Sequence, residues 1–177
     1  MDAGEGSDAE RDVALRNVIK TNTFIFCEDA RGIRFFEILA RRLVGNQCRI
    51  KVMSFKGPFD SKAEHAIKAA AYSAHKIIVV VDAHGKHGLA DRIFHGLKTV
   101  VDEGCKLSVV VCEHSIEDWL VANECKELKR ETALEYLKRD RDYAKRHLPG
   151  YAERIKPDIL KLKSPSFRKF YESLLDP

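Results

Sequence analysis

The 177-residue sequence lacks the signatures of several common classes of protein. Its five cysteines include no C-x-x-C pair, and no two histidines show H-E-x-x-H spacing, so neither a disulfide scaffold nor a zinc site is predicted. No apolar stretch approaches the roughly 20 residues that span a bilayer. The glycine-lysine pattern of a P-loop and the G-x-G-x-x-G of a dinucleotide site are also missing. These absences favour a cytoplasmic protein in a reducing compartment, with no membrane partner.

The length suits one domain, and the charge distribution suggests how the chain is organised. The net charge is +4, but residues 1–125 hold 17 Lys and Arg against 18 Asp and Glu, whereas residues 126–177 hold 14 against 9. We therefore predict a mobile acidic segment over 1–21, an α/β domain over 22–125, and a basic helical extension that packs on that domain. The extension either attracts a polyanion or is a solvated helix surface.

Hydrophobic patterning predicts the fold class. Continuous apolar runs at 23–27, 77–81 and 107–112 are typical of strands that are buried on both faces. A fourth run at 49–55 alternates with charged residues and is typical of an edge or half-buried strand. Because helical stretches separate these runs, we expect an α/β fold with a parallel, mostly four-stranded sheet, flanked by helices and joined by right-handed crossovers.

The last third of the chain is predicted to be helical. Lys126 to His147 is highly charged with a sparse apolar stripe, and Pro149-Gly150 follows it as a helix breaker. Two shorter helices are expected at about 151–161 and 165–175. No internal repeat, coiled-coil seam or low-complexity tract is present.

Carboxylates follow the three buried runs, as Glu28, Asp82 and Glu113. In an open α/β sheet, ligands bind beyond the carboxyl ends of the strands, and we expect these side chains to meet there. Oxygen-rich clusters are what Mg²⁺ and Mn²⁺ require, so the pattern predicts a divalent-cation site. The alternative is that each carboxylate caps the helix that follows it.

Neighbouring residues add candidates to this site. His84 follows Asp82 by two positions, which directs both side chains toward one ion if the loop is extended. Glu117 lies in the first turn of a predicted helix that Trp119 would fix by burial, so either Glu113 or Glu117 could be aimed at the cation.

Four motifs together resemble the Toprim fold of topoisomerases, bacterial primases and OLD-family nucleases, and more closely a group of small Toprim-like proteins of largely unassigned function. They are Cys27-Glu28-Asp29, Val80-Val81-Asp82-Ala83-His84, Ile116-Glu117-Asp118-Trp119-Leu120 and Ser164-Pro165-Ser166-Phe167. The resemblance covers about residues 23–175, and the Ile116 to Leu120 motif is the most specific part.

The resemblance implies Glu28 as general base or metal ligand, with Asp82 and Glu117 as ligands. His84 and Glu113 are auxiliary metal-ligand candidates from position alone. His84 stands where the Toprim D-x-D has its second acid, and Gly32 stands where the first motif usually has another acid. Both departures remove negative charge, and Mg²⁺ prefers oxygen ligands while imidazole suits Mn²⁺ or zinc, so Mg²⁺ affinity should fall.

We therefore expect Mg²⁺- or Mn²⁺-dependent phosphodiester chemistry on nucleic acid, most simply nuclease activity. The alternatives are a catalytically degenerate Toprim-like module that binds nucleic acid or a protein partner, and a phosphohydrolase of small molecules. Residues expected to contact nucleic acid are Arg31, Lys86, Lys138, Arg139, Arg141, Lys145 and Arg146.

Overall fold

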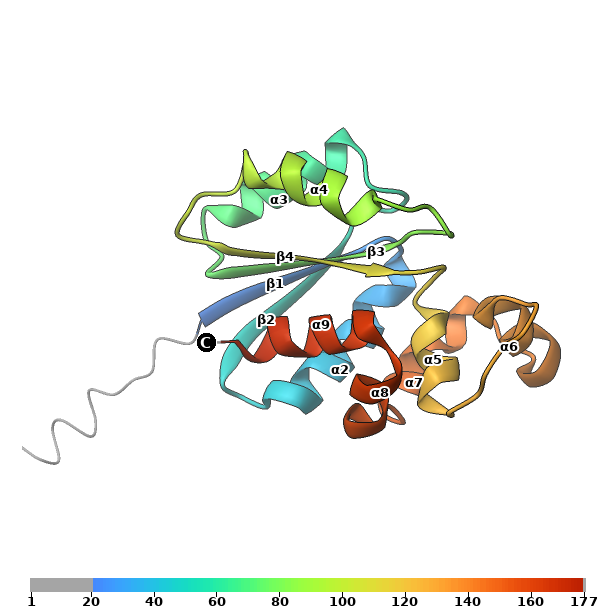
Figure 1. Ribbon diagram of the computed structural model, residues 1–177. Helices are drawn as coiled ribbons and strands as arrows, with labels where there is room; N and C mark the ends of the chain where they lie inside the picture. The colour runs from blue at the N-terminus through green and yellow to red at the C-terminus, as the bar shows by residue number, and fades with distance from the viewer. Residues whose placement is uncertain (1–20, 177) are drawn as a thin grey trace, which may run out of the picture.

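A computed structural model describes residues 21–176 and shows an α/β fold (Figure 1). Its one sheet has four parallel strands in the order β2-β1-β3-β4. The strands are β1 (Thr21–Cys27), β2 (Cys48–Ser54), β3 (Lys76–Asp82) and β4 (Lys106–Cys112). Eight α-helices and one 3₁₀ helix flank the sheet within the described residues. The predicted fold class is confirmed: a four-stranded parallel sheet with helices on both faces and C-terminal helices.

Burial along the strands follows the apolar patterns in the sequence. The first six residues of β3 are all buried, as expected for a central strand between β1 and β4. In β2, Val52 is buried, whereas Arg49 and Lys51 are exposed, because β2 is an edge strand. The continuous runs therefore include both central strands, β1 and β3, and also the edge strand β4, whereas the alternating run is the other edge, β2.

Helices cover the two faces of the sheet as separate layers (Figure 1). On one face α3 (Ser61–Ala71) and α4 (Leu89–Lys98) pack against Phe24 and Phe26 of β1. On the other face α2 (Ala30–Val44) packs against Ile25, and the C-terminal helices enlarge the same core. The two faces thus bury alternate side chains of β1, as the strand period of two requires.

The C-terminal third departs from the single charged helix predicted over 126–147. The helices there are α5 (Glu117–Asn123), α6 (Ala133–Arg141), the 3₁₀ helix η1 (Lys145–His147), α7 (Leu148–Ala152), α8 (Pro157–Lys163) and α9 (Pro165–Leu175). A capping box of Thr132 and Glu135 begins α6, and Asp142 ends it in the left-handed conformation, with φ of 47°. Pro149 does not break a helix but stands in the first turn of α7, where its missing N–H costs nothing.

Two of the sequence motifs meet in the core beneath the sheet. Trp119 is fully buried and donates a hydrogen bond from Nε1 to Ser166 Oγ at 2.8 Å, while its ring lies edge-on to Phe167 with centroids 5.1 Å apart. Ser164 caps α9 by accepting from the Phe167 amide, and Pro165 occupies the first helical position. The Ser164 to Phe167 motif therefore starts α9 and supplies the partners of Trp119.

The remaining predictions on organisation are only partly covered by the structure. The segment 1–21 lies outside the described residues except for Thr21, which belongs to β1, and the division at residue 125 stays a prediction. All five cysteines lie within the described range and are free thiols. No helix in the described part of the chain is long and apolar enough to cross a membrane.

Candidate metal centre

The site lies where the connectivity of the sheet reverses. From β1 the chain moves to β2 on one side, then crosses to β3 on the other side and continues outward to β4. Strands β1 and β3 are therefore the neighbours at the topological switch point, beyond whose carboxyl ends open α/β sheets bind ligands. Glu28 directly follows β1 and Asp82 ends β3, so both carboxylates are at this point.

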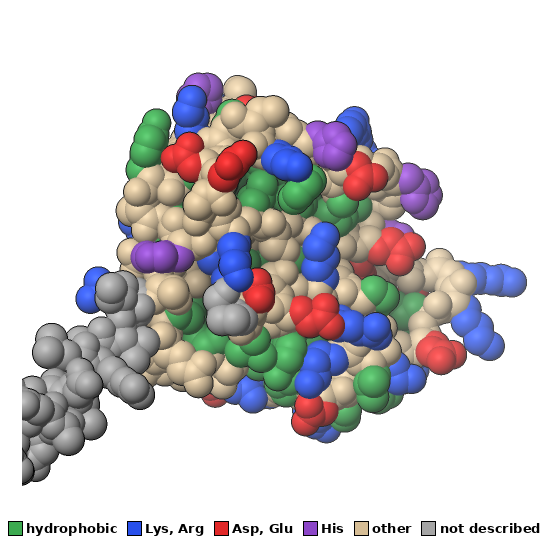
Figure 2. All heavy atoms as spheres, turned by 60° about the vertical axis from the view of Figure 1, so that its left-hand side comes forward, with side chains coloured by type: hydrophobic (Ala, Val, Ile, Leu, Met, Phe, Trp, Pro, Cys, Tyr) green, Lys and Arg blue, Asp and Glu red, His purple; other side chains and the backbone are tan. Residues whose placement is uncertain are grey.

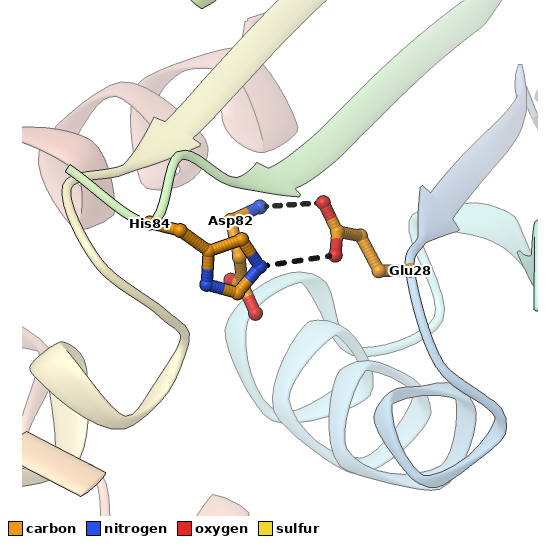
Figure 3. A group of neighbouring side chains, drawn as sticks. All are labelled: Glu28, Asp82 and His84. Atoms are coloured by element: carbon orange, nitrogen blue, oxygen red, sulfur yellow. Dashed lines mark hydrogen bonds and ion pairs between the residues drawn. The ribbon is translucent and has the colours of Figure 1, made fainter. Parts of the chain in front are cut away.

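The backbone of β3 orients the side chain of Glu28. Its Oε1 accepts a hydrogen bond from the Asp82 amide at 2.9 Å, across 54 residues of sequence (Figure 3). Burial leaves the Glu28 side chain 19% exposed. One carboxylate oxygen is thus held by the fold, and the other, Oε2, faces the Asp82–His84 segment.

His84 is held over the two carboxylates by the loop that follows β3. Its amide donates to His114 O at 3.1 Å, and the amide of Gly85 donates to Glu113 O at 2.8 Å. His84 has a φ of 47°, in the left-handed region that a non-glycine residue adopts at a cost and that is common at functional sites. Its Nε2 lies 4.0 Å from Glu28 Oε2 (Figure 3).

Ligand atoms of Glu28, Asp82 and His84 all lie within 4.8 Å of one another. Beside the two carboxylates is a cavity of about 20 Å³, lined also by Cys27, Gly32 and Leu148. That volume is close to the room for a single water-sized sphere. Two carboxylates and an imidazole at this separation form a donor set for one small divalent cation, with imidazole favouring Mn²⁺ over Mg²⁺.

The two carboxyl groups are held where ionisation is costly. Burial, followed by the charges of Glu28 and Glu117, raises the pKa of Asp82 to about 8, although Lys145 opposes the shift. Burial also raises the pKa of Glu28, against the opposing effects of the Asp82 amide and the charges of His84 and Lys145. Such shifts are typical of sites that hold like charges together for a ligand or reaction.

Glu117 lies close enough to raise the pKa of Asp82, but other groups already engage its carboxylate. The side chain is fully buried, Tyr143 donates its hydroxyl to Oε1 at 2.8 Å, and Lys145 Nζ lies 2.9 Å from Oε1 and 3.1 Å from Oε2. Glu117 is outside the group formed by Glu28, Asp82 and His84. The Glu117 carboxylate is therefore neutralised by the Lys145 ammonium group.

Adjacent acids have structural roles that the capping alternative describes well. Asp29 caps α2, because its side chain accepts from the amides of Arg31 at 2.7 Å and Gly32 at 3.0 Å. Asp118 accepts from the amides of His114 and Ser115 and so fixes the turn before α5. Helix capping thus accounts for Asp29, whereas Glu28 points to Asp82.

Gly32 also has a packing explanation. A Cβ atom there would lie 3.0 Å from Cys27 Sγ, so glycine permits α2 to approach the end of β1 closely. Gly32, which stands where the resembled motif has an acid, therefore lies in close contact with Cys27 beneath the site.

Glu113 lies elsewhere. It is exposed and lines an open groove of about 560 Å³ together with His114, Asp118 and Lys126. The structure does not bring Glu113 into the group of Glu28, Asp82 and His84.

The residues predicted to contact nucleic acid form two sets. Arg31 and Lys86 are exposed beside the site, at the start of α2 and in the loop after β3, and Lys138 and Arg146 are exposed farther along the chain. Arg139 pairs with Glu131 and Asp140, Arg141 pairs with Glu124, and Lys145 pairs with Glu117 and Asp29. On the face drawn in Figure 2, Lys and Arg side chains are interspersed with Asp and Glu rather than gathered in one patch.

Sequence reasoning missed the roles of two residues at this site. The sequence patterns predict no role for Tyr143 and predict a nucleic-acid contact for Lys145, whereas both side chains bind Glu117. One signal is present: Glu117 lies on the same short helix as the apolar residues Trp119 and Leu120, and a carboxylate that such a helix buries requires a cation and donors from elsewhere in the chain.

The chain matches no protein-family model, no curated protein and no solved structure. The Toprim resemblance therefore stays a prediction, based on the four motifs.

Proposed function

We propose that the protein binds one divalent cation, preferentially Mn²⁺ over Mg²⁺, and uses it to cleave phosphodiester bonds in nucleic acid. The observation that carries this proposal is the convergence of Glu28, Asp82 and His84 at the switch point of the sheet, with ligand atoms within 4.8 Å. The fold and the Toprim resemblance support the assignment to nucleic acid.

The three side chains would share the work as follows. Asp82 and His84 hold the cation from the end of β3 and the loop after it. Glu28 keeps Oε1 on the Asp82 amide and offers Oε2 to the cation or to the proton of an attacking water. A bound divalent cation supplies polarisation of a phosphoryl oxygen and a water of lowered pKa. Arg31 and Lys86 are exposed in the segments next to Glu28 and His84 and would contact the phosphates that flank the bond.

The test is a cleavage assay on supercoiled plasmid, single-stranded DNA and single-stranded RNA, in Mg²⁺, Mn²⁺ or EDTA. We expect cleavage with Mn²⁺ to exceed that with Mg²⁺, and Glu28→Gln and Asp82→Asn to lower the rate about 100-fold or more. Glu103→Gln is the matched control, because Glu103 is exposed and precedes β4 at the opposite end of the strands. Activity that is undiminished in Glu28→Ala and Asp82→Ala refutes the assignment.

A second function is favoured by a specific observation. An imidazole replaces one acid of the motif, and Glu117 is occupied by Lys145, which leaves two carboxylates for a cation. This arrangement supports a non-catalytic module that binds nucleic acid or a protein partner. Salt-sensitive binding of nucleic acid in EDTA, with no cleavage in either metal, would favour that function over the nuclease.

A further inference from the structure

Lys145 is the cation that the fold itself places among the acids. Its Nζ lies 2.9 Å from Glu117 Oε1 and 3.5 Å from Asp29 Oδ2. Its charge also acts on Glu28 and Asp82, which are the carboxylates of the candidate metal centre. One ammonium group therefore contacts Glu117 of α5 and Asp29 of the loop between β1 and α2, and its charge acts on Glu28 of the same loop and on Asp82 of β3.

The position of Lys145 is fixed by local structure. Asp142 in the left-handed conformation ends α6 and turns the chain, so that η1 begins at Lys145. Tyr143, two residues earlier, is buried and donates its hydroxyl to the same Glu117 carboxylate. The Lys145 side chain is 36% exposed, so it reaches the buried Glu117 carboxylate from the protein surface.

The charge balance determines how many ions the site can take. When all four carboxylates are ionised, Lys145 leaves a net charge of −3, which one divalent cation reduces to −1. Without Lys145 the same acids carry −4, the charge that two divalent cations neutralise. Two-metal sites of phosphodiester chemistry hold their ions about 3.5–4 Å apart, with carboxylates on both.

We infer that the Lys145 ammonium occupies the place of a second cation, and so restricts the centre to one divalent ion bound by Glu28, Asp82 and His84. This inference rests on the proposed function. Lys145 is thus a positioning residue, because its charge neutralises part of the charge of Glu117 and Asp29 and prevents Glu117 from binding the metal. Glu28 and Asp82 then remain available to bind the divalent ion.

The experiment is a titration of the full chain with Mn²⁺, in which electron paramagnetic resonance counts free ion and calorimetry gives affinity. We expect one Mn²⁺ per chain for the natural sequence and for Lys145→Arg, and two for Lys145→Met. Lys129→Met is the matched control, because Lys129 is exposed and loses the same charge away from the acids; it should bind one ion. The double variant Lys145→Met with Glu117→Gln should return to one, because the second ion needs Glu117.

The outcomes separate this inference from the proposed function. One ion in both the natural chain and Lys145→Met, whatever its affinity, overturns the inference and leaves the proposed function standing, as do two ions in the natural chain. No ion in the natural chain but one in Lys145→Met overturns the inference of a one-ion centre and refutes metal chemistry by the natural protein. No ion in either overturns both. Where Lys145→Met does not fold, Lys145→Gln keeps a donor for Glu117 and carries the same expectations.

Discussion

The carboxylate of Glu28 accepts a hydrogen bond from the backbone amide of Asp82 at 2.9 Å, which joins the ends of two neighbouring parallel strands. The bond aligns two acids that repel each other when both are ionised. Because this repulsion destabilises the fold, binding of a cation or a proton at the pair should stabilise it. The first two predictions follow from this relationship.

Asp82→Asn should stabilise the metal-free protein. The pKa of Asp82 is raised to about 8 in the folded chain, so ionisation costs more in the folded than in the unfolded state. The free energy of unfolding of the natural chain should therefore fall as pH rises from about 4 to about 8, and the asparagine variant lacks this loss. Thermal melts in EDTA at pH 9 should give the variant an advantage of about 1–2 kcal/mol, or several degrees. A variant that melts below the natural chain at this pH would show that the charge of Asp82 stabilises the fold.

Mn²⁺ affinity should depend on pH through the same group. A bound cation requires ionised Asp82, so below the pKa of about 8 the ion must displace a proton. We expect affinity to rise up to tenfold per pH unit from pH 6 to pH 8, and then to level off. Calorimetry in buffers of different ionisation enthalpy measures both the affinity and the proton released. An affinity that is constant across this range contradicts the assignment of Asp82 as a ligand.

Removal of the Glu117 carboxylate should destabilise the fold rather than only the metal site. Glu117→Ala leaves the Tyr143 hydroxyl and the Lys145 ammonium without their buried partner, at a cost of about 2–4 kcal/mol. Glu113→Ala, at an exposed acid four residues earlier, should change stability by less than about 0.5 kcal/mol. Urea denaturation of both variants measures the difference. Equal stability of the two would mean that the Glu117 pair contributes nothing to folding.

Nucleic-acid affinity should depend more on unpaired basic residues near the site than on the arginines of α6. Arg31→Glu and Lys86→Glu should weaken binding and reduce the slope of log affinity against log salt by about 1 per lost phosphate contact. Arg139 and Arg141 already pair with acids, so Arg139→Gln and Arg141→Gln should change the slope less. Fluorescence anisotropy of labelled single strands at several salt concentrations provides the measurement. A larger change of the slope in the Arg139 and Arg141 variants than in the Arg31 and Lys86 variants would indicate that nucleic acid binds at α6.

The sequence was sufficient to predict the sheet and the meeting of Glu28 with Asp82. Continuous apolar runs predict β1, β3 and β4, the alternating run predicts β2 as an edge strand, and parallel strands bring their carboxyl ends to one end of the sheet. The continuous run of β4 did not indicate that β4 is the other edge strand. The strand order β2-β1-β3-β4 then makes the ends of β1 and β3 neighbours. His84 joins them because the loop after β3 stays bonded to the end of β4.

The environment of Glu117 could not be predicted in the same way. The charged stretch over 126–147 predicts one helix, with Lys145 among the residues that contact nucleic acid. In the structure, Asp142 takes a left-handed conformation that ends α6, and the chain returns Lys145 and Tyr143 to α5. The sequence around Asp142 gives little indication of this left-handed conformation, yet the conformation determines whether Lys145 faces solvent or pairs with the buried Glu117. The partnership of Trp119 with Ser166 and Phe167 is likewise a long-range contact that only the fold reveals.

The most direct test of the central claim is the location of a divalent ion in crystals of the full chain grown with Mn²⁺. Anomalous diffraction should show one Mn²⁺ per chain, bound by Glu28, Asp82 and His84, with Lys145 still on Glu117. Crystals that show no Mn²⁺ at this site, or an ion only among other residues, would contradict the account.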